Sequence, residues 1–138
     1  MLCQGGPVIR NNLMFEVKIA SGFAAAHQLK MESEKCESLH GHNWKVEVCV
    51  QGNKLNTVGL LMDFGDLKKL VAEIVARMDH KCLNDLDCFK GLNPSSENIA
   101  RFIAQSLDAR IRNETVRVSK VSIWESEDAC ATYILVGQ

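Results

Sequence analysis

The chain has 138 residues and a formal net charge of −1 at pH 7, with 46% hydrophobic and 24% charged residues. This size and composition are typical of one globular domain built around one hydrophobic core. Because there is no excess of basic residues, we expect neither nucleic acid nor an anionic membrane as a partner. No segment has the ~18 apolar residues of a membrane helix, and residues 1–12 lack the apolar run of a secretory signal. We therefore expect a cytoplasmic protein.

Six cysteines are present: Cys3, Cys36, Cys49, Cys82, Cys88 and Cys130. An even number would suit disulfides in a secreted protein, but the cytoplasm keeps thiols reduced. The absence of a Cys-x-x-Cys pair also disfavours a cysteine-rich structural zinc site. We expect most of these cysteines to be small buried hydrophobic residues, with Cys36 as the candidate for chemistry.

The first part of the chain predicts an arm, two strands and a loop. Residues 1–12 have the composition of a loose arm, and we place a single domain at residues 13–138. Apolar and polar residues alternate from Phe15, and an apolar stretch continues this strand to His27. A polar loop without periodicity follows over residues 28–41, and a second alternating strand begins at Trp44.

A turn near residues 52–56 leads to two predicted amphipathic helices. The first starts near Asp63–Asp66, and its apolar stripe contains Leu67, Leu70, Val71, Ile74, Val75 and Met78. The run Asn93–Glu97 has the composition of a helix start. Two more strands are predicted over Val116–Trp124 and Ala129–Val136.

The order β-β-α-α-β-β predicts an α+β domain, in which an antiparallel four-stranded sheet carries both helices on one face. A small sheet leaves two edges to protect, and four apolar residues lie in the C-terminal strands with few charges among them: Val121, Ile123, Ile134 and Val136. We expect these edges to be paired in a homo-oligomer. The alternative is a monomer with an open sheet.

Three of the four histidines suit a metal site. His40 and His42 flank Gly41, so both imidazoles lie on one face of an extended chain, and the glycine permits unusual backbone angles and close approach. If the strand that ends at His27 pairs with this segment, the three imidazoles converge. Three histidines with an open fourth position are the pattern of a catalytic zinc site. The alternative is that His40 and His42 are two surface histidines at a strand start.

Four further residues are candidates for chemistry. Cys36, four residues before His40, would be a fourth zinc ligand, a nucleophile or base, or an inert loop cysteine. Asp79 would orient the His80 imidazole, unless His80 only ends a helix. Glu125 at a strand end would accept two N–H groups from a planar heterocycle, or remain a solvated charge.

Six short segments stand in a fixed order along the chain: His27, Cys36-Glu37-Ser38-Leu39-His40-Gly41-His42, Met62-Asp63-Phe64, Asp79-His80-Lys81-Cys82-Leu83-Asn84, Asn93-Pro94-Ser95-Ser96-Glu97-Asn98 and Trp124-Glu125-Ser126. Each is a weak signal alone. Together they resemble the 6-pyruvoyl-tetrahydropterin synthase superfamily from about Phe15 to Val136. The resemblance implies the tunnelling fold (T-fold), in which trimers close their sheets into a barrel and stack into hexamers.

The resemblance also implies roles by position. The zinc ligands match His27, His40 and His42, so the implied cofactor is Zn²⁺. The catalytic cysteine matches Cys36, and the pair that activates it, typically from a neighbouring subunit, matches Asp79 and His80. The carboxylate that anchors the pterin ring matches Glu125. Hydroxyl residues that also contact the pterin, usually threonines, match Ser95 and Ser96.

The spacing Cys-x-x-x-His-Gly-His looks like that of the 6-carboxy-5,6,7,8-tetrahydropterin synthase branch of queuosine (7-deazaguanine) biosynthesis. This implies a small-molecule pterin substrate, 7,8-dihydroneopterin triphosphate, and the products 6-carboxy-5,6,7,8-tetrahydropterin, acetaldehyde and triphosphate. Two alternatives stay open: a 6-pyruvoyl-tetrahydropterin synthase without carbon–carbon cleavage, and a non-catalytic zinc-stabilised oligomer that binds pterins. A branch that only trims the side chain replaces the cysteine with glutamate; Cys36 opposes that branch, although Glu37 stands beside it.

Overall fold

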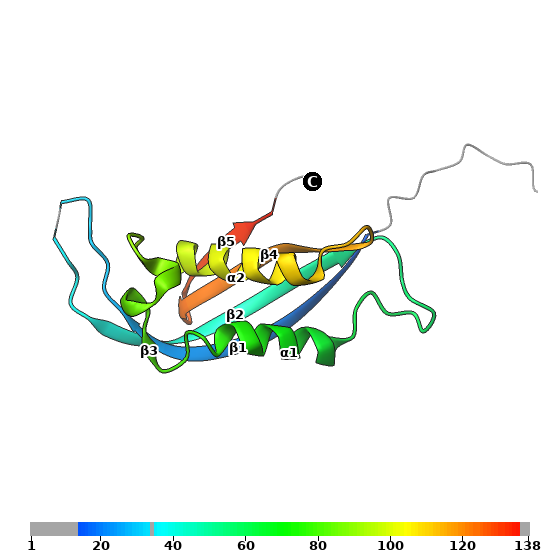
Figure 1. The fold of residues 1–138 in the computed structure, drawn as a ribbon, viewed down its shortest axis with the longest axis horizontal. Coiled ribbons are helices and arrows are strands. Elements are labelled where there is room, and N and C mark those ends of the chain that lie inside the picture. The colour runs from blue at the N-terminus through cyan, green and yellow to red at the C-terminus, as the bar shows by residue number, and fades with distance from the viewer. Residues whose placement is uncertain (1–13, 34, 136–138) are drawn as a thin grey trace, which may run out of the picture.

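The computed structural model describes residues 14–33 and 35–135. They form a five-stranded sheet and two α-helices (Figure 1). The elements are β1 (Phe15–His27), β2 (His40–Gly52), α1 (Phe64–Val75), β3 (Lys81–Cys82), α2 (Ser96–Ile111), β4 (Val116–Ser126) and β5 (Ala129–Ile134), with short 3₁₀ turns at Leu83–Asp85 and Asp87–Phe89. The arm expected at residues 1–12 lies outside the described residues, and the single domain expected over residues 13–138 stays a prediction.

The strand order in the sheet is β3-β1-β2-β4-β5. The four predicted strands are all present and pair antiparallel with their neighbours, so the α+β prediction is confirmed. The additional strand, β3, pairs in parallel with Ala25 and Ala26 of β1. It escaped prediction because a strand of two residues has no periodic pattern to detect.

Of the apolar residues in the C-terminal strands, Val121 and Ile123 do not lie at a sheet edge. Both belong to β4, which lies between β2 and β5, and both side chains are 0% exposed. The edges of the sheet are β3 and β5, and the Ile134 side chain on β5 is 61% exposed. Val136 lies outside the described residues. Pairing of the β5 edge with another subunit stays a prediction.

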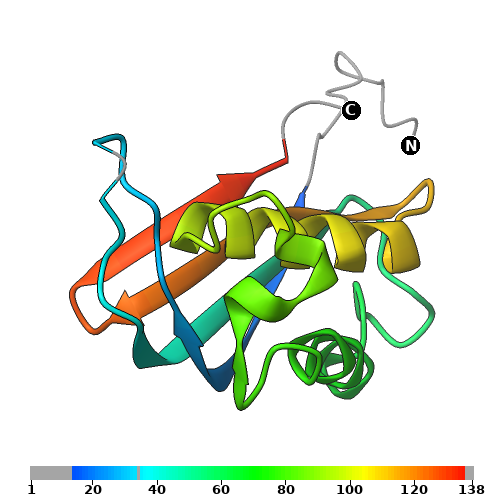
Figure 2. The same cartoon turned by 60° about the vertical axis from the view of Figure 1, so that its left-hand side comes forward.

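Both helices cover the same face of the sheet and contact each other (Figure 1, Figure 2). Asp63 caps α1 by accepting a hydrogen bond from Asp66 N at 3.0 Å, and Ser95 caps α2 by accepting one from Asn98 N at 3.2 Å. These side chains satisfy amide groups that the first helical turn leaves unpaired. α1 ends before Met78, which is nevertheless fully buried in the turn that follows. No helix in residues 14–33 and 35–135 is long and apolar enough to cross a bilayer.

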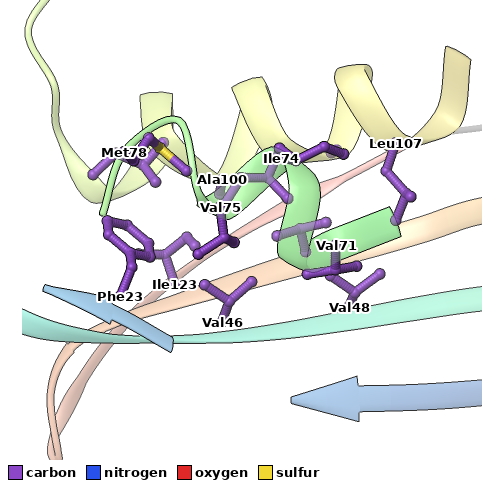
Figure 3. Close-up of a cluster of buried hydrophobic side chains, with 14 of the residues drawn as sticks. Phe23, Val46, Val48, Val71, Ile74, Val75, Met78, Ala100, Leu107 and Ile123 are labelled. Atoms are coloured by element: carbon purple, nitrogen blue, oxygen red, sulfur yellow. The ribbon is translucent and has the colours of Figure 1, made fainter. Parts of the chain in front are cut away.

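The hydrophobic core lies between the sheet and the two helices (Figure 3). Val46 and Val48 of β2 face the apolar side of α1, which includes Val71 and Ile74. Burial of such a side chain contributes about 1.5–3 kcal/mol. Because side chains alternate along a strand, the residues two and four positions before Val46, Trp44 and His42, point to this same helix-covered side. The strand pattern that builds the core therefore also directs the histidines.

The cysteines within the described residues are free thiols. Cys49 is buried in the sheet, and burial raises the pKa of its thiol to about 11. Cys36 and Cys130 are exposed, while Cys82 and Cys88 are half-buried. The expectation that most cysteines are buried is therefore wrong: apart from Cys49, they lie on loops, on short elements or on the β5 edge, at the periphery of the molecule.

Candidate metal centre and active site

The predicted site residues gather at one end of the sheet, on the left in Figure 1. β1 and β4 end there, and β2 and α2 begin there. Neighbouring antiparallel strands run in opposite directions, so the end of one lies beside the start of the next. His27 at the end of β1, His40 at the start of β2 and Glu125 near the end of β4 therefore meet, although they are far apart in sequence.

The three predicted zinc ligands converge through their Nε2 atoms. The β1–β2 register pairs His27 with His40, and the Nε2 atoms of these two rings are 3.1 Å apart. The ring centroid of His42 lies 5.3 Å from that of His27 and 4.7 Å from that of His40. One ligand atom from each of the three histidines and from Glu125 lies within 4.8 Å of the others. Such a group can hold one metal ion.

Backbone carbonyl groups hold two of the imidazoles from behind. His27 Nδ1 is 2.7 Å from Pro94 O, and His40 Nδ1 is 2.6 Å from Ser38 O. Because a carbonyl oxygen only accepts, we assign the proton to Nδ1 in both rings, which leaves the lone pair on Nε2. Two lone pairs 3.1 Å apart repel unless a cation lies between them. A tetrahedral Zn²⁺ with Zn–N distances of about 2.0–2.1 Å places two nitrogens roughly 3.3 Å apart, so these donors fit a metal ion.

The protonation state of His42 also favours metal binding. Burial lowers the pKa of its imidazole below the ordinary value, and the neighbouring His40 and His27 act in the same direction, against the opposing effect of Glu125. A lowered pKa keeps the ring neutral at pH 7, and the neutral ring is the form that binds metals. His27 is 1% exposed while the His40 side chain is 35% exposed, so the centre is open to solvent on one side.

Glu125 lies directly beside the histidines. Its Oε1 is 2.8 Å from His42 Nε2 and 3.6 Å from His27 Nε2. At this position the carboxylate can complete the ligand set of a metal, or turn to accept N–H groups of a bound ring. From the sequence, Glu125 was expected to bind a planar heterocycle or to remain a solvated charge. Its position on a strand did not show how closely it approaches His42. Its role as the pterin anchor stays a prediction.

Asp79 and His80 form a carboxylate–imidazole pair, here called the dyad, with His80 Nδ1 2.9 Å from Asp79 Oδ2. Both residues are fastened to β1: Ala24 N donates to Asp79 Oδ1 at 2.9 Å, and His80 N donates to Ala24 O at 2.6 Å. The hydrogen bonds from Ala24 N–H and from His80 lower the pKa of the Asp79 carboxyl group. His80 has a φ of 58°, an uncommon value for a residue other than glycine, and its side chain is 80% exposed. The dyad is thus held in place and faces solvent.

His80 of the dyad and His42 of the metal centre both line an open cleft of about 440 Å³. Gly41 lies in the cleft wall as part of regular strand β2, without a positive φ. A β-carbon at Gly41 would meet only Ala25 O, at 3.7 Å. The strand pairing alone therefore aligns His40 and His42, without the unusual backbone angles that glycine permits.

Cys36 belongs to a different segment from the dyad. It belongs to the hairpin that joins β1 to β2, described over residues 28–33 and 35–39, and its side chain is exposed. Within the described part of the chain, Asp79 and His80 make no hydrogen bond or ion pair with Cys36. One chain therefore brings the three histidines together with Glu125, and Asp79 with His80, but does not join the dyad to the cysteine.

Ser95 and Ser96 are half-buried at the start of α2, next to Pro94. Because Ser95 Oγ accepts the hydrogen bond from Asn98 N, its hydroxyl proton remains available for a ligand. The pterin contacts of both serines stay predictions.

Several supports of the metal centre were missed from the sequence. The carbonyl groups of Pro94 and Ser38 belong to the backbone, so the residue types at these positions do not indicate this role. Trp44 packs edge-on against His27 and His42, with ring centroids 4.9 and 5.0 Å away, and its indole N–H donates to Ala25 O at 3.1 Å. The alternating pattern identified Trp44 only as a core residue of a strand.

The chain is similar to known proteins in sequence and in fold. The 6-pyruvoyl tetrahydropterin synthase family model matches residues 16–134. An Archaeoglobus fulgidus protein, provisionally named 6-carboxy-5,6,7,8-tetrahydropterin synthase, is 40% identical over 115 residues, which cover 83% of this chain and 91% of that protein. The dihydroneopterin monophosphate aldolase of Pyrococcus furiosus is 36% identical over 108 residues, which cover 78% of this chain and 87% of that protein.

The solved structure of Caenorhabditis elegans 6-pyruvoyl tetrahydropterin synthase has a TM-score of 0.78 and 26% identity, and the match covers 90% of this chain and 97% of that chain. This likeness confirms the expected T-fold, and the family match confirms the resemblance found in the sequence. The chain therefore belongs to the 6-pyruvoyl tetrahydropterin synthase family.

Proposed function

We propose that this chain is a zinc-dependent lyase that converts 7,8-dihydroneopterin triphosphate and water into 6-carboxy-5,6,7,8-tetrahydropterin, acetaldehyde and triphosphate. The observation that carries the proposal is the convergence of three imidazole Nε2 atoms in a member of a pterin synthase family. The Cys-x-x-x-His-Gly-His spacing and the name of the Archaeoglobus fulgidus relative support the carboxy product. We place the reaction in the cytoplasm, where an exposed thiol such as Cys36 stays reduced.

The donor atoms support zinc as the metal, because three imidazole nitrogens and one carboxylate oxygen are ligands that it accepts. When bound, Zn²⁺ would supply Lewis acidity toward the hydroxyl groups of the substrate side chain. His27, His40 and His42 would hold it. Glu125 would complete the ligand set in the free protein, or accept the amino and ring N–H groups of a bound pterin. Ser95 and Ser96 would contribute hydroxyl groups to the same pterin.

The reaction also needs a group that moves protons between the carbon and oxygen atoms of the substrate side chain. We assign this role to the Cys36 thiolate as general base, with the dyad as its activating partner. Since no hydrogen bond or ion pair joins Cys36 to the dyad among the described residues of one chain, we place the dyad of one subunit beside Cys36 of another. The exposed, rigidly held ring of His80 suits such a contact. The active form would then be a homo-oligomer, a trimer or a hexamer built from two trimers.

A second candidate reaction is aldol cleavage of the dihydroneopterin phosphate side chain. The Pyrococcus furiosus relative is named an aldolase of this kind. Glu37 favours the candidate, because its Oε1 atom is buried and has no hydrogen-bond partner among the described residues. A buried polar atom without a partner is uncommon and invites a ligand. In this reaction the Glu37 carboxylate would replace Cys36 as the base.

The test is incubation of the zinc-loaded protein with 7,8-dihydroneopterin triphosphate and, separately, with the monophosphate. Products are identified by mass, and acetaldehyde is assayed. Acetaldehyde together with a carboxypterin supports the main proposal. A 6-pyruvoyl product without acetaldehyde would replace the reaction and leave the site assignment intact. A hydroxymethyl pterin with glycolaldehyde phosphate would establish the aldolase. No turnover by metal-replete protein would leave a non-catalytic pterin-binding oligomer.

A further inference from the structure

The side chains of Asn84 and Asn93 bind the backbone of the segment that leaves β1. Asn84 Oδ1 accepts a hydrogen bond from Gln28 N at 2.9 Å, and Asn84 Nδ2 donates to Gln28 O at 2.8 Å. Asn93 binds Lys30 in the same way, at 2.9 and 2.8 Å. Each carboxamide therefore occupies both the N–H and the C=O of one residue, as a neighbouring β-strand would.

The two asparagine side chains continue the pairing along this edge of β1 beyond the point where β3 ends. β3 pairs with Ala25 and Ala26 and ends at Cys82, after which the chain enters a 3₁₀ turn. In an extended chain the N–H and C=O groups of alternate residues point to the same side. Without the two carboxamides, the polar groups of Gln28 and Lys30 would lack these protein partners along that edge. Unpaired backbone groups favour local opening of a segment.

The opposite edge of the same segment carries the chain that contains Cys36. Glu37 N donates to Leu29 O at 2.9 Å, and Lys30 and Cys36 form an isolated β-bridge. The Gln28 side chain adds a hydrogen bond from its Nε2 to Glu37 O at 2.6 Å. The positions of Cys36 and Glu37 therefore depend on the strand that the asparagines hold.

The hairpin is also tied to the metal centre at both ends. It leaves β1 directly after His27 and joins β2 at His40. Pro94, the neighbour of Asn93, has its carbonyl oxygen 2.7 Å from His27 Nδ1. Asn93 O in turn accepts a hydrogen bond from Asn98 Nδ2 at 2.8 Å. The segment before α2 thus holds a metal ligand and the hairpin together.

We propose that Asn84 and Asn93 are positioning residues, which set the place of the Cys36 hairpin relative to the metal centre without touching the substrate. The inference deepens the proposed function and rests on it, because it concerns the hairpin that carries the proposed base. A shift of about 1 Å in a reacting group can reduce turnover by roughly 10²-fold. Two side chains that fix a strand on both of its polar groups are suited to prevent such a shift.

The test compares Asn84→Ala and Asn93→Ala with the control Asn56→Ala. Asn56 also binds backbone amides through its side chain, those of Val58 and Leu60 at 3.0 Å, in the loop at the opposite end of the molecule (Figure 1). In the first two variants, hydrogen exchange at Glu37 N–H on the far edge should rise up to about tenfold, the effect of losing one net hydrogen bond. We expect kcat to fall about 10- to 100-fold, with KM and zinc content near wild type. Asn56→Ala should change none of these.

The substitutions Asn84→Asp and Asn93→Asp guard against poor folding of the alanine variants. Each keeps the side-chain volume and the acceptor for the backbone N–H but turns a second acceptor toward the carbonyl group, so kcat should fall at least as far as in the alanine variants. A purely structural role predicts lower thermal stability with an unchanged kcat per bound zinc. Unchanged exchange at Glu37, or wild-type kcat in all folded variants, would overturn the inference alone. If the wild-type protein turns over no pterin, the proposed function fails, and the positioning role is overturned with it.

Discussion

His27 Nε2 and His40 Nε2 face each other at 3.1 Å, and the Nδ1 atom of each ring lies against a backbone carbonyl oxygen. This relationship follows from the β1–β2 register, which pairs these two residues directly. A slip of one residue would turn one imidazole to the other face of the sheet. The alternation of buried and exposed residues sets the register of β1 and β2, and this register places the imidazoles of the metal centre.

Removal of a proposed ligand should remove the metal. We expect His27→Ala and His42→Ala to be purified without stoichiometric zinc, because two imidazoles and a carboxylate bind more weakly than the full set. His80→Ala serves as the control, since the His80 ring pairs with Asp79 and lies outside the ligand group. Zinc content is measured by mass spectrometry of the metal. Stoichiometric zinc in both ligand variants would contradict the assignment.

Chelation should destabilise the protein without unfolding it. The core between the sheet and the helices does not depend on the metal, so the far-ultraviolet circular dichroism should persist in the apoprotein. Zinc at about 100 times its Kd should stabilise the folded state by roughly 2.7 kcal/mol, which raises Tm. The Tm of His27→Ala should not respond to zinc. Loss of the circular dichroism signal on chelation would indicate a structural zinc site instead.

Cys36→Ala should retain zinc and lose turnover by about 10²–10⁴-fold, as is typical for loss of one acid–base group. Cys130→Ala is the matched control, because Cys130 is also an exposed free thiol but lies on β5. Zinc content and product formation are measured on the same samples. If Cys36→Ala loses zinc, the cysteine is a ligand. If Glu37→Gln alone abolishes turnover, the base is the carboxylate of the second candidate reaction.

The contribution of Asp79 to stability should depend on pH. Its pKa is lowered in the folded protein, first by the hydrogen bond from Ala24 N–H and then by His80. A lowered folded pKa means that the stabilisation is present above the unfolded value of about 3.9 and is lost as the pH falls through the folded pKa. In urea unfolding, Asp79→Asn should be less stable than wild type at pH 7, and the difference should shrink toward pH 3. A difference that is constant with pH would contradict this.

Gly52→Ala should destabilise the fold by about 1–3 kcal/mol, the usual cost of overpacking. A β-carbon at Gly52 would lie 2.1 Å from Thr115 O and 2.7 Å from Leu61 Cδ1, and a backbone oxygen cannot move aside easily. The control is Gly41→Ala, where a β-carbon meets only Ala25 O, at 3.7 Å. Urea unfolding measures both variants. Equal stability of the two would show that the sheet adjusts at Gly52.

Local patterns in the sequence were sufficient for most elements of the fold. Alternation from Phe15 and from Trp44 predicted β1 and β2, and it also showed that His40 and His42 share a face. The Asp63 and Asn93–Glu97 regions predicted the starts of both helices, because capping groups act within one helical turn. These features depend on neighbouring residues, which the sequence displays directly.

Long-range features were not accessible in this way. The place of β4 inside the sheet, and thus the burial of Val121, depends on which strands pair. The sequence pattern of an apolar strand does not show whether the strand lies at an edge or in the centre of a sheet. Likewise, the dyad lies against β1 through its hydrogen bonds to Ala24 and through the pairing of β3 with β1, and no local pattern in the sequence indicates these contacts.

By itself, the sequence determined the four longer strands and the two helices, the shared face of His40 and His42, and the resemblance to a pterin synthase family, since each depends on residue type and spacing along the chain. Only the tertiary structure decided that Glu125 reaches His42, that Pro94 supports His27, and that Asn84 and Asn93 hold the Cys36 hairpin. These contacts join segments that are distant in sequence. They exist because strand pairing and the packing of the helices on the sheet bring the ends of several elements together.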